Sequence, residues 1–196
     1  MQLSSEQVHW IDGGLIAVFS LALIILETRR RKFQWTKFFV PAGLLILAAG
    51  LIFDPLFHGE QAAESFQREI RQHFGLGLIL TPAAAVETGL ALRLLDGKFW
   101  RLILPLALAL VGAGFFFHAQ HQADAFSALL LTAQHRFMGA TLFLCGATKA
   151  VGELVTGENK EFKLVWLFLL LLFGFELLLY TEGNSIFGQS GGRHKM

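Results

Sequence analysis

Residues 162–180 read FKLVWLFLLLLFGFELLLY, and this stretch decides the class of fold. Apart from Lys163, Gly174 and Glu176, every residue in it is apolar. A helix that crosses a bilayer needs about 20 mostly apolar residues. Only helices and closed barrels satisfy their backbone groups in lipid, and barrel strands alternate apolar and polar residues. The continuous run therefore predicts a transmembrane helix.

Five further segments share this character. They are residues 11–27, 38–57, 73–92, 102–118 and 137–154. Charged residues make up 16% of the chain, against about 25% in soluble domains. The sequence thus predicts an all-α integral membrane protein, in which residues 1–182 form one six-helix bundle and residues 183–196 form a flexible tail.

Lysine and arginine placement predicts the orientation, because cytoplasmic loops are enriched in both residues. Eleven lie on one side: Arg29, Arg30, Arg31, Lys32, Lys37, Arg93, Lys98, Arg101, Lys149, Lys160 and Lys163. Five lie on the other: Arg68, Arg71, Arg136, Arg193 and Lys195. We therefore expect a multi-pass protein of the cell inner membrane with both termini outside the cytoplasm.

The seven histidines all fall on the predicted outer side, although the orientation was assigned without them. They are His9, His58, His73, His118, His121, His135 and His194. Ionisable residues near membrane depth usually serve a site or pair with one another. His9 and His194, which lie close to the two termini, are interpreted as surface groups.

An internal repeat supports a site among the other histidines. Residues 57–66 read FHGEQAAESF and residues 117–126 read FHAQHQADAF, which aligns His58 with His118 and Glu64 with Asp124. After two extra residues in the second copy, Gln72-His73 corresponds to Gln134-His135. The second and third spans and the fourth and fifth spans thus form a predicted parallel repeat, related by a pseudo-two-fold axis along the membrane normal.

This pairing predicts a transition-metal or haem site, because imidazole binds zinc, copper and iron and helices of a bundle can present it to one centre. The predicted cofactor-binding residues are His58, His73, His118 and His135, and the predicted metal ligands also include His121, Glu64 and Asp124. The two acids have an alternative interpretation as helix caps. Met138 is the one methionine near the cluster, which favours zinc, copper(II), iron or haem b over copper(I).

Four other residues predict structure more than chemistry. Cys145 has apolar neighbours and is interpreted as a packed thiol. Glu87 and Glu176 lie deep in predicted spans, where pairing with Lys149 would lower the cost of burial. A proton path or ion site is the alternative for these acids. No HExxH, Walker or CxxCH sequence is present, and no enzyme class is predicted. The net charge of +1 gives no nucleic-acid footprint.

The dipeptides Phe57-His58, Gln72-His73, Phe117-His118 and Gln134-His135, spread over residues 38–154, carry a family resemblance. The arrangement resembles copper-resistance membrane proteins of the CopD type. It is also similar to small b-type cytochrome bundles of the b561 kind, which differ in placing histidines at both membrane faces. The first resemblance implies copper handling, and the second implies a haem bundle.

The sequence therefore leaves three functions open. The first is a histidine and carboxylate metal centre near the periplasmic face, for metal handling or redox chemistry. The second is a b-type haem protein that exchanges electrons with quinone or a periplasmic donor. The third is a structural subunit of a larger membrane complex. The expected partners are the lipid bilayer, other membrane subunits and a periplasmic redox or metal-carrier protein.

Overall fold

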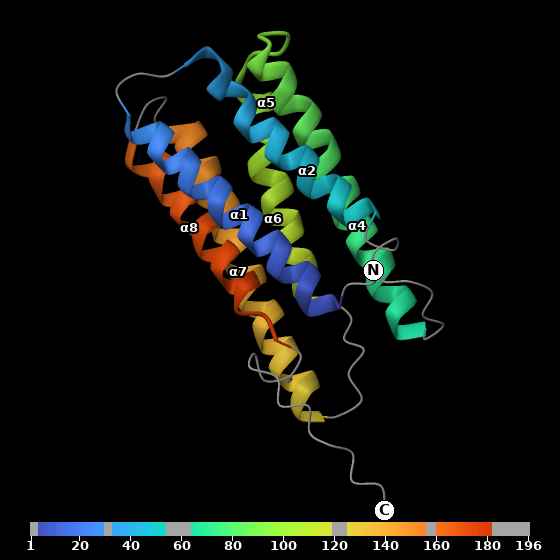
Figure 1. Ribbon diagram of the computed structural model, residues 1–196. Helices are drawn as coiled ribbons and strands as arrows, with labels where there is room; N and C mark the ends of the chain where they lie inside the picture. The colour runs from blue at the N-terminus through green and yellow to red at the C-terminus, as the bar shows by residue number, and fades with distance from the viewer. Residues whose placement is uncertain (1–3, 30–32, 54–63, 119–124, 156–159, 182–196) are drawn as a thin grey trace, which may run out of the picture.

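The computed structural model describes residues 4–29, 33–53, 64–118, 125–155 and 160–181, and every element in these ranges is a helix (Figure 1). The long helices are α1 (Ser5–Thr28), α2 (Phe39–Phe53), α4 (Glu64–Ala91), α6 (Ile103–Phe115), α7 (Ala125–Val155) and α8 (Lys160–Leu178). Two short helices, η1 (Gln34–Phe38) and α5 (Lys98–Arg101), precede α2 and α6. The predicted all-α class is confirmed.

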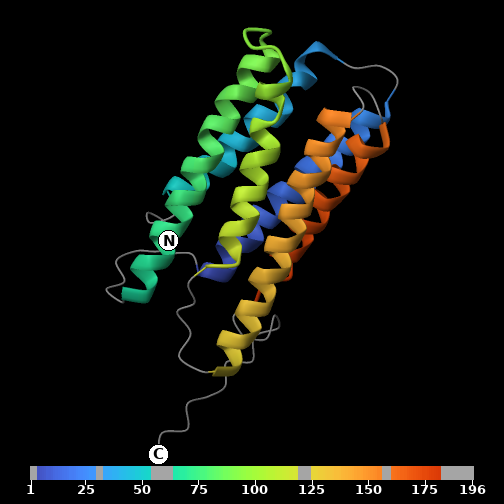
Figure 2. The same ribbon diagram turned by 180° about the vertical axis from the view of Figure 1, so that it is seen from behind.

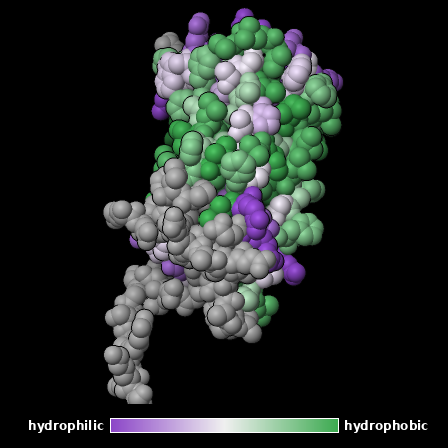
Figure 3. Space-filling model, turned by 90° about the vertical axis from the view of Figure 1, so that its right-hand side faces the viewer, coloured by the Kyte–Doolittle hydropathy of each residue, from purple (hydrophilic) through white to green (hydrophobic). Residues whose placement is uncertain are grey.

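Five stretches of the described chain are long and apolar enough to cross a membrane. They are Glu6–Thr28, Gln34–Phe53, Ile70–Ala91, Lys98–Phe115 and Ala128–Val155. The sixth predicted span forms α8, which packs against α1 and α7. Large apolar side chains such as Val18, Leu129 and Phe137 are exposed on the outside of the bundle. Figure 3 shows a broad hydrophobic band between zones of hydrophilic residues.

The six long helices run alternately up and down and form a ring (Figures 1 and 2). The closest pairs are α1 with α8, α6 with α7 and α2 with α4, and further contacts join α7 to α8 and α4 to α6. Only sparse contacts join α1 to α2. We call this last junction the α1–α2 seam, because it is where the ring is least closed.

Glycines allow the closest helix pairs to approach. A Cβ atom on Gly13 of α1 would lie 2.7 Å from the carbonyl oxygen of Gly174 on α8. A Cβ atom on Gly139 of α7 would lie 2.7 Å from the carbonyl oxygen of Gly112 on α6. Small residues at such crossings replace the hydrophobic driving force that helices lack in lipid with close backbone packing.

Two helices begin well before the predicted starts at residues 73 and 137. Helix α4 begins at Glu64 and α7 at Ala125, so His73 and His135 lie inside helices and not at their first residues. Hydropathy detects only the apolar part of a helix, and polar residues extend both helices past it. With a rise of 1.5 Å per residue, the 31 residues of α7 span about 46 Å, more than the roughly 30 Å of bilayer hydrocarbon.

Candidate functional site

Four histidine side chains from four parts of the chain meet at one end of the ring. We call His9 of α1, His73 of α4, His118 just after α6 and His135 of α7 the histidine cluster. The ring of His118 stacks between the rings of His73 and His135, and the centroid distances are 5.1 Å to His73 and 4.6 Å to His135. His9 meets the edges of His73 and His135 at 6.1 and 6.2 Å.

The interpretation of His9 as a surface group is wrong. Its side chain is 7% exposed, as is that of His73, and His135 is only 2% exposed. A capping box in which Ser4 and Gln7 bond each other's backbone starts α1 early enough to place His9 inside the first turns of the helix. The ring therefore faces the bundle interior, where it packs as an aromatic side chain.

The residues just after α8 pack against the histidine cluster and form hydrogen bonds with α1 and α7. The buried Tyr180 ring stacks on His9 with centroids 4.0 Å apart. Trp10 Nε1 donates a hydrogen bond to the Tyr180 carbonyl oxygen at 2.8 Å. The Gln134 amide donates to the Thr181 carbonyl oxygen at 3.1 Å and accepts from the Thr181 backbone N–H at 3.2 Å. These bonds hold α1, α7 and α8 together around the histidines.

The hydrogen bond of His135 assigns the roles of its two ring nitrogens. Nδ1 lies 2.8 Å from the carbonyl oxygen of Leu131, one turn earlier in α7. Because a carbonyl oxygen only accepts, Nδ1 carries the proton, and Nε2 holds the lone pair in the neutral ring. Metal-binding histidines commonly use this arrangement, in which one nitrogen donates to a carbonyl and the other binds the ion.

The side-chain orientations do not form a ready-made metal site. Within the described part of the chain, no three His, Cys, Asp or Glu residues are grouped so that they could hold an ion. The rings of His73, His118 and His135 are within 13° to 19° of parallel, and stacked faces do not aim their nitrogens at one point. Of the other predicted ligands, His58, His121 and Asp124 lie outside the described residues. Glu64 is the first residue of α4, and its side chain lies outside the description too.

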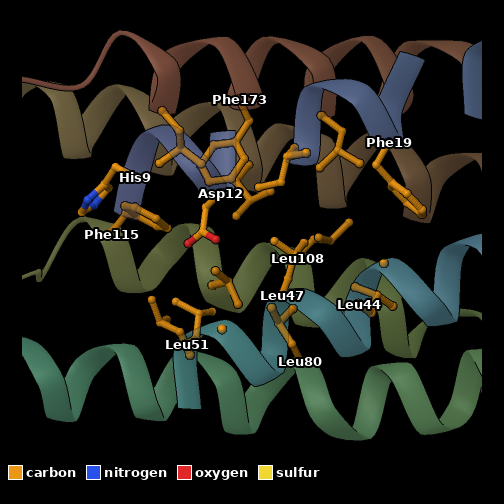
Figure 4. Close-up of a pocket in the computed structure, with 18 of the residues that line it drawn as sticks. His9, Asp12, Phe19, Leu44, Leu47, Leu51, Leu80, Leu108, Phe115 and Phe173 are labelled. Carbon is orange, nitrogen blue, oxygen red and sulfur yellow. The ribbon is translucent and has the colours of Figure 1, made fainter. Parts of the chain in front are cut away.

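An apolar cavity of about 110 Å³ extends from the histidine cluster along the inside of the ring. Its polar lining residues are His9, Asp12, His73 and His118, at the same end. The Asp12 carboxylate points into the cavity among Leu51, Leu108 and Phe115 (Figure 4).

Asp12 was not among the predicted site residues, although the spacing of residues along this helix could have indicated it. His9, Asp12, Ile16, Phe19 and Leu23 recur at alternating spacings of three and four residues, which is the pattern of one helix face. All five line the cavity, so this face of α1 is the one turned toward the centre of the ring.

The opposite end of the ring holds a larger, charged cavity of about 830 Å³. Its charged lining residues are Glu27, Lys37, Glu87, Arg93, Lys149, Glu153 and Lys163. The salt bridge of Lys149 is with Glu153, at 3.2 Å. The two residues lie four apart on one helix face, where such pairs form readily. Glu87, one of the two predicted partners, lines the same cavity and interacts with the charge of Lys149 at longer range. Lys149 Nζ also lies 4.8 Å from the ring centroid of Trp166.

Two buried groups sit on the helices between these ends. Glu176 accepts a hydrogen bond from the Thr141 hydroxyl at 2.7 Å, which joins α8 to α7, and its Oε2 atom has no hydrogen-bond partner among the described residues. Cys145 is fully buried and its thiol donates to the Trp166 carbonyl oxygen at 3.2 Å. The prediction of a packed thiol is confirmed.

Comparisons with protein-family models, with curated proteins and with solved structures give no match to this chain. The resemblances to CopD-type proteins and to b-type cytochrome bundles therefore stay predictions. A function can therefore be inferred only from the histidine cluster, the two cavities and the charges around them.

Proposed function

We propose that the chain is a multi-pass protein of the inner membrane whose histidine cluster binds a transition-metal ion near the outer face, for metal handling or redox chemistry. The observation that carries the proposal is the convergence of four imidazole rings from α1, α4, the end of α6 and α7. Burying several polar rings at one place is costly unless they interact. A shared ion gives this arrangement a function.

The spacing of the rings supports one shared ion. Because a zinc–nitrogen bond is about 2.0–2.1 Å long, two imidazoles on one ion have ring centroids roughly 5 to 6 Å apart. The four ring contacts in the cluster have centroid distances from 4.6 to 6.2 Å, and each joins His9 or His118 to His73 or His135. Binding of one ion requires the stacked rings to rotate about their side-chain bonds so that their nitrogens converge. The Nδ1 bond of His135 to Leu131 already leaves Nε2 as its ligand atom.

The same spacing favours an ion over haem b. In a bis-histidine haem the macrocycle lies between two imidazoles that meet the iron through nitrogen. His118 instead stacks face to face on His135 at 4.6 Å and on His73 at 5.1 Å. Imidazole ligands suit zinc, copper(II) and iron, and these three remain the candidate ions.

The distribution of positive charge supports placing the cluster outside the cytoplasm. Among the described residues, seven belong to helix ends or turns at the end opposite the cluster (Figure 1): Arg29 after α1, Lys37 in η1, Arg93 after α4, Lys98 and Arg101 in α5, Lys149 near the end of α7 and Lys163 near the start of α8. Three lie at the histidine end: Arg68 and Arg71, which precede His73 in α4, and Arg136, which follows His135 in α7. An excess of lysine and arginine is typical of the cytoplasmic side.

Two sets of equivalent contacts support the proposed parallel repeat. The alignment that pairs His58 with His118 pairs Ile52 with Gly112, and the one that pairs His73 with His135 pairs Gly77 with Gly139. A Cβ atom on Gly77 would lie 2.8 Å from Ile52 Cγ1, and one on Gly139 would lie 2.7 Å from the Gly112 carbonyl oxygen. The two hairpins therefore cross at matching positions.

The glutamines of the two Gln-His dipeptides also have matching roles. Gln72 donates to the carbonyl oxygen of Phe117, at the end of α6, at 2.9 Å. Gln134 bonds both backbone groups of Thr181, just beyond the end of α8. Each glutamine thus fastens the end of a neighbouring helix next to the histidine that follows it in sequence.

Metal analysis of the purified full-length protein tests the proposal. After chelation and reloading with Zn²⁺ or Cu²⁺, the wild type should bind about one ion and show no Soret band. His118→Phe keeps an aromatic ring in the stack but removes the nitrogens. It should lower the affinity at least tenfold, because loss of even an outer-shell partner costs about 10–100-fold.

Lys149→Gln is the control, since it removes a positive charge at the opposite end of the ring, and it should bind the ion as the wild type does. Binding by His118→Phe at wild-type affinity would sink the metal proposal. A Soret band in the wild type would select haem instead.

A further inference from the structure

The central cavity has the size and lining of a site for one small ring. Its volume is about 110 Å³, of the order of an engineered apolar cavity of about 150 Å³ that takes up benzene. Leu44, Leu47 and Leu51 of α2 line one wall, and Leu108 and Phe173 line others. Apolar cavities of this kind stay dry and accept apolar molecules.

The polar end of the cavity selects a neutral head group. His9, Asp12, His73 and His118 gather there, and they can donate and accept hydrogen bonds. No lysine or arginine is among the described residues that line the cavity, so a lipid phosphate would lack its usual cation. The Asp12 carboxylate would repel the carboxylate of a fatty acid. A neutral ring with carbonyl oxygens, attached to an apolar tail, fits both ends of the site.

The α1–α2 seam offers this ligand a route from the membrane. Gly43 and Gly50 of α2 lie seven residues apart and face Phe19 and Asp12 of α1, which are also seven residues apart. The position of a Cβ atom on Gly43 lies 2.6 Å from Phe19 Cζ, and that on Gly50 lies 3.8 Å from Asp12 Oδ1. The Phe19 ring therefore lies directly on the backbone of α2. Since Phe19 also lines the cavity, rotation of its side chain connects the cavity with the seam.

We infer that the cavity binds a lipid-soluble quinone, with the head group at Asp12 and the histidines and the isoprenoid tail leaving through the α1–α2 seam. The quinone ring is neutral, is about the size of the cavity, and carries two carbonyl oxygens that accept hydrogen bonds from imidazole. This inference rests on the proposed membrane insertion but not on the bound metal.

Equilibrium binding of decylubiquinone to the chelator-treated full chain in phospholipid nanodiscs tests the inference. The readout is saturable retention of the quinone by nanodiscs that contain the protein, corrected with empty nanodiscs. Leu47→Trp fills the cavity and should weaken binding at least tenfold. Ile46→Trp adds the same side chain to the lipid-exposed neighbour, which is 58% exposed, and should bind as the wild type does.

Further variants test the entry route of the quinone, the folding of the cavity variant and the metal site separately. Phe19→Ala should speed association several-fold and change affinity little. Leu108→Phe narrows the cavity from α6 and replaces Leu47→Trp if that variant does not fold. Retention of metal binding in Leu47→Trp shows an intact cluster. Loss of quinone binding in Leu47→Trp with metal binding retained separates the cavity from the metal site, because Leu47 lies outside the histidine cluster.

Three outcomes would overturn the inference. The first is the absence of saturable binding. The second is equal affinity in the Leu47→Trp and Ile46→Trp proteins. The third is displacement of the quinone by equimolar oleate, which would assign the cavity to acyl chains.

Discussion

The two ends of the six-helix ring accommodate polar groups in different ways. The histidine end gathers neutral aromatic rings, which stack on each other and on Tyr180. The opposite end gathers full charges around a wide cavity and holds Lys149 by an ion pair to Glu153 and by the face of Trp166. Histidine is uncharged for much of the time near neutral pH, so it packs as an aromatic ring, whereas lysine needs a counter-charge or water.

The difference indicates which end can exchange ligands. Neutral imidazoles can bind a metal ion through their lone pairs, and they keep it only while they stay deprotonated. At the charged end, Lys149 already has a counter-charge in Glu153. Chemistry that depends on protons and metals is therefore expected at the histidine end, and sensitivity to salt and to charge reversal at the other.

The largest expected effect separates the two ends by pH. Free imidazole has a pKa of about 6.5, and protons compete with a metal for the ring. Lowering the outer pH from about 7 to about 5 should weaken metal binding by about 25-fold for each ring that takes up a proton with the pKa of free imidazole. The same change on the inner side should have little effect. Metal occupancy in oriented vesicles, titrated separately on each side, gives the measurement. Equal sensitivity on both sides would break the comparison.

An intermediate effect is expected where α6 and α7 cross, because both helices contribute to the cluster. A Cβ atom on Gly112 would lie 2.6 Å from the backbone nitrogen of Phe143, so Gly112→Ala forces the helices apart. We expect a loss of about 1–3 kcal/mol in stability. Gly75→Ala is the matched control, because no atom lies within 4 Å of its Cβ position. Thermal unfolding in detergent compares the two, and equal midpoints would contradict the crossing.

The smallest effect is expected at the charged end. Lys149→Gln leaves Glu153 without its ion pair, whose side chains are 13% and 27% exposed. The pair lies beside a cavity large enough to hold water, so its loss should lower the free energy of unfolding by about 1 kcal/mol. High salt should reduce the difference from the wild type. A larger loss of stability that salt does not change would mean that this end is as dry as the histidine end.

The helices were predictable because long apolar runs favour helices, and five of the six predicted spans overlap stretches that are long and apolar enough to cross a membrane. Residues 162–180 form α8, as predicted for a helix, but α8 is not among these five stretches. The convergence of His73, His118 and His135 followed from their shared side and was partly predictable. His9 was not, because its burial depends on the Ser4 cap that starts α1 early. The Lys149 pair was predicted across helices, but the nearer partner, Glu153 on the same helix, was available at lower entropic cost.

The length of α7 gives the molecule a mechanical property. The helix continues without a break from Ala125 through His135, so roughly 15 Å of it precedes the histidine ring. A continuous helix moves as one body, and the close contact of α7 with α6, at Gly139 and Gly112, lies one turn beyond His135. A sideways displacement of the first turns of α7 would therefore shift His135 by a smaller amount against its stacked neighbours.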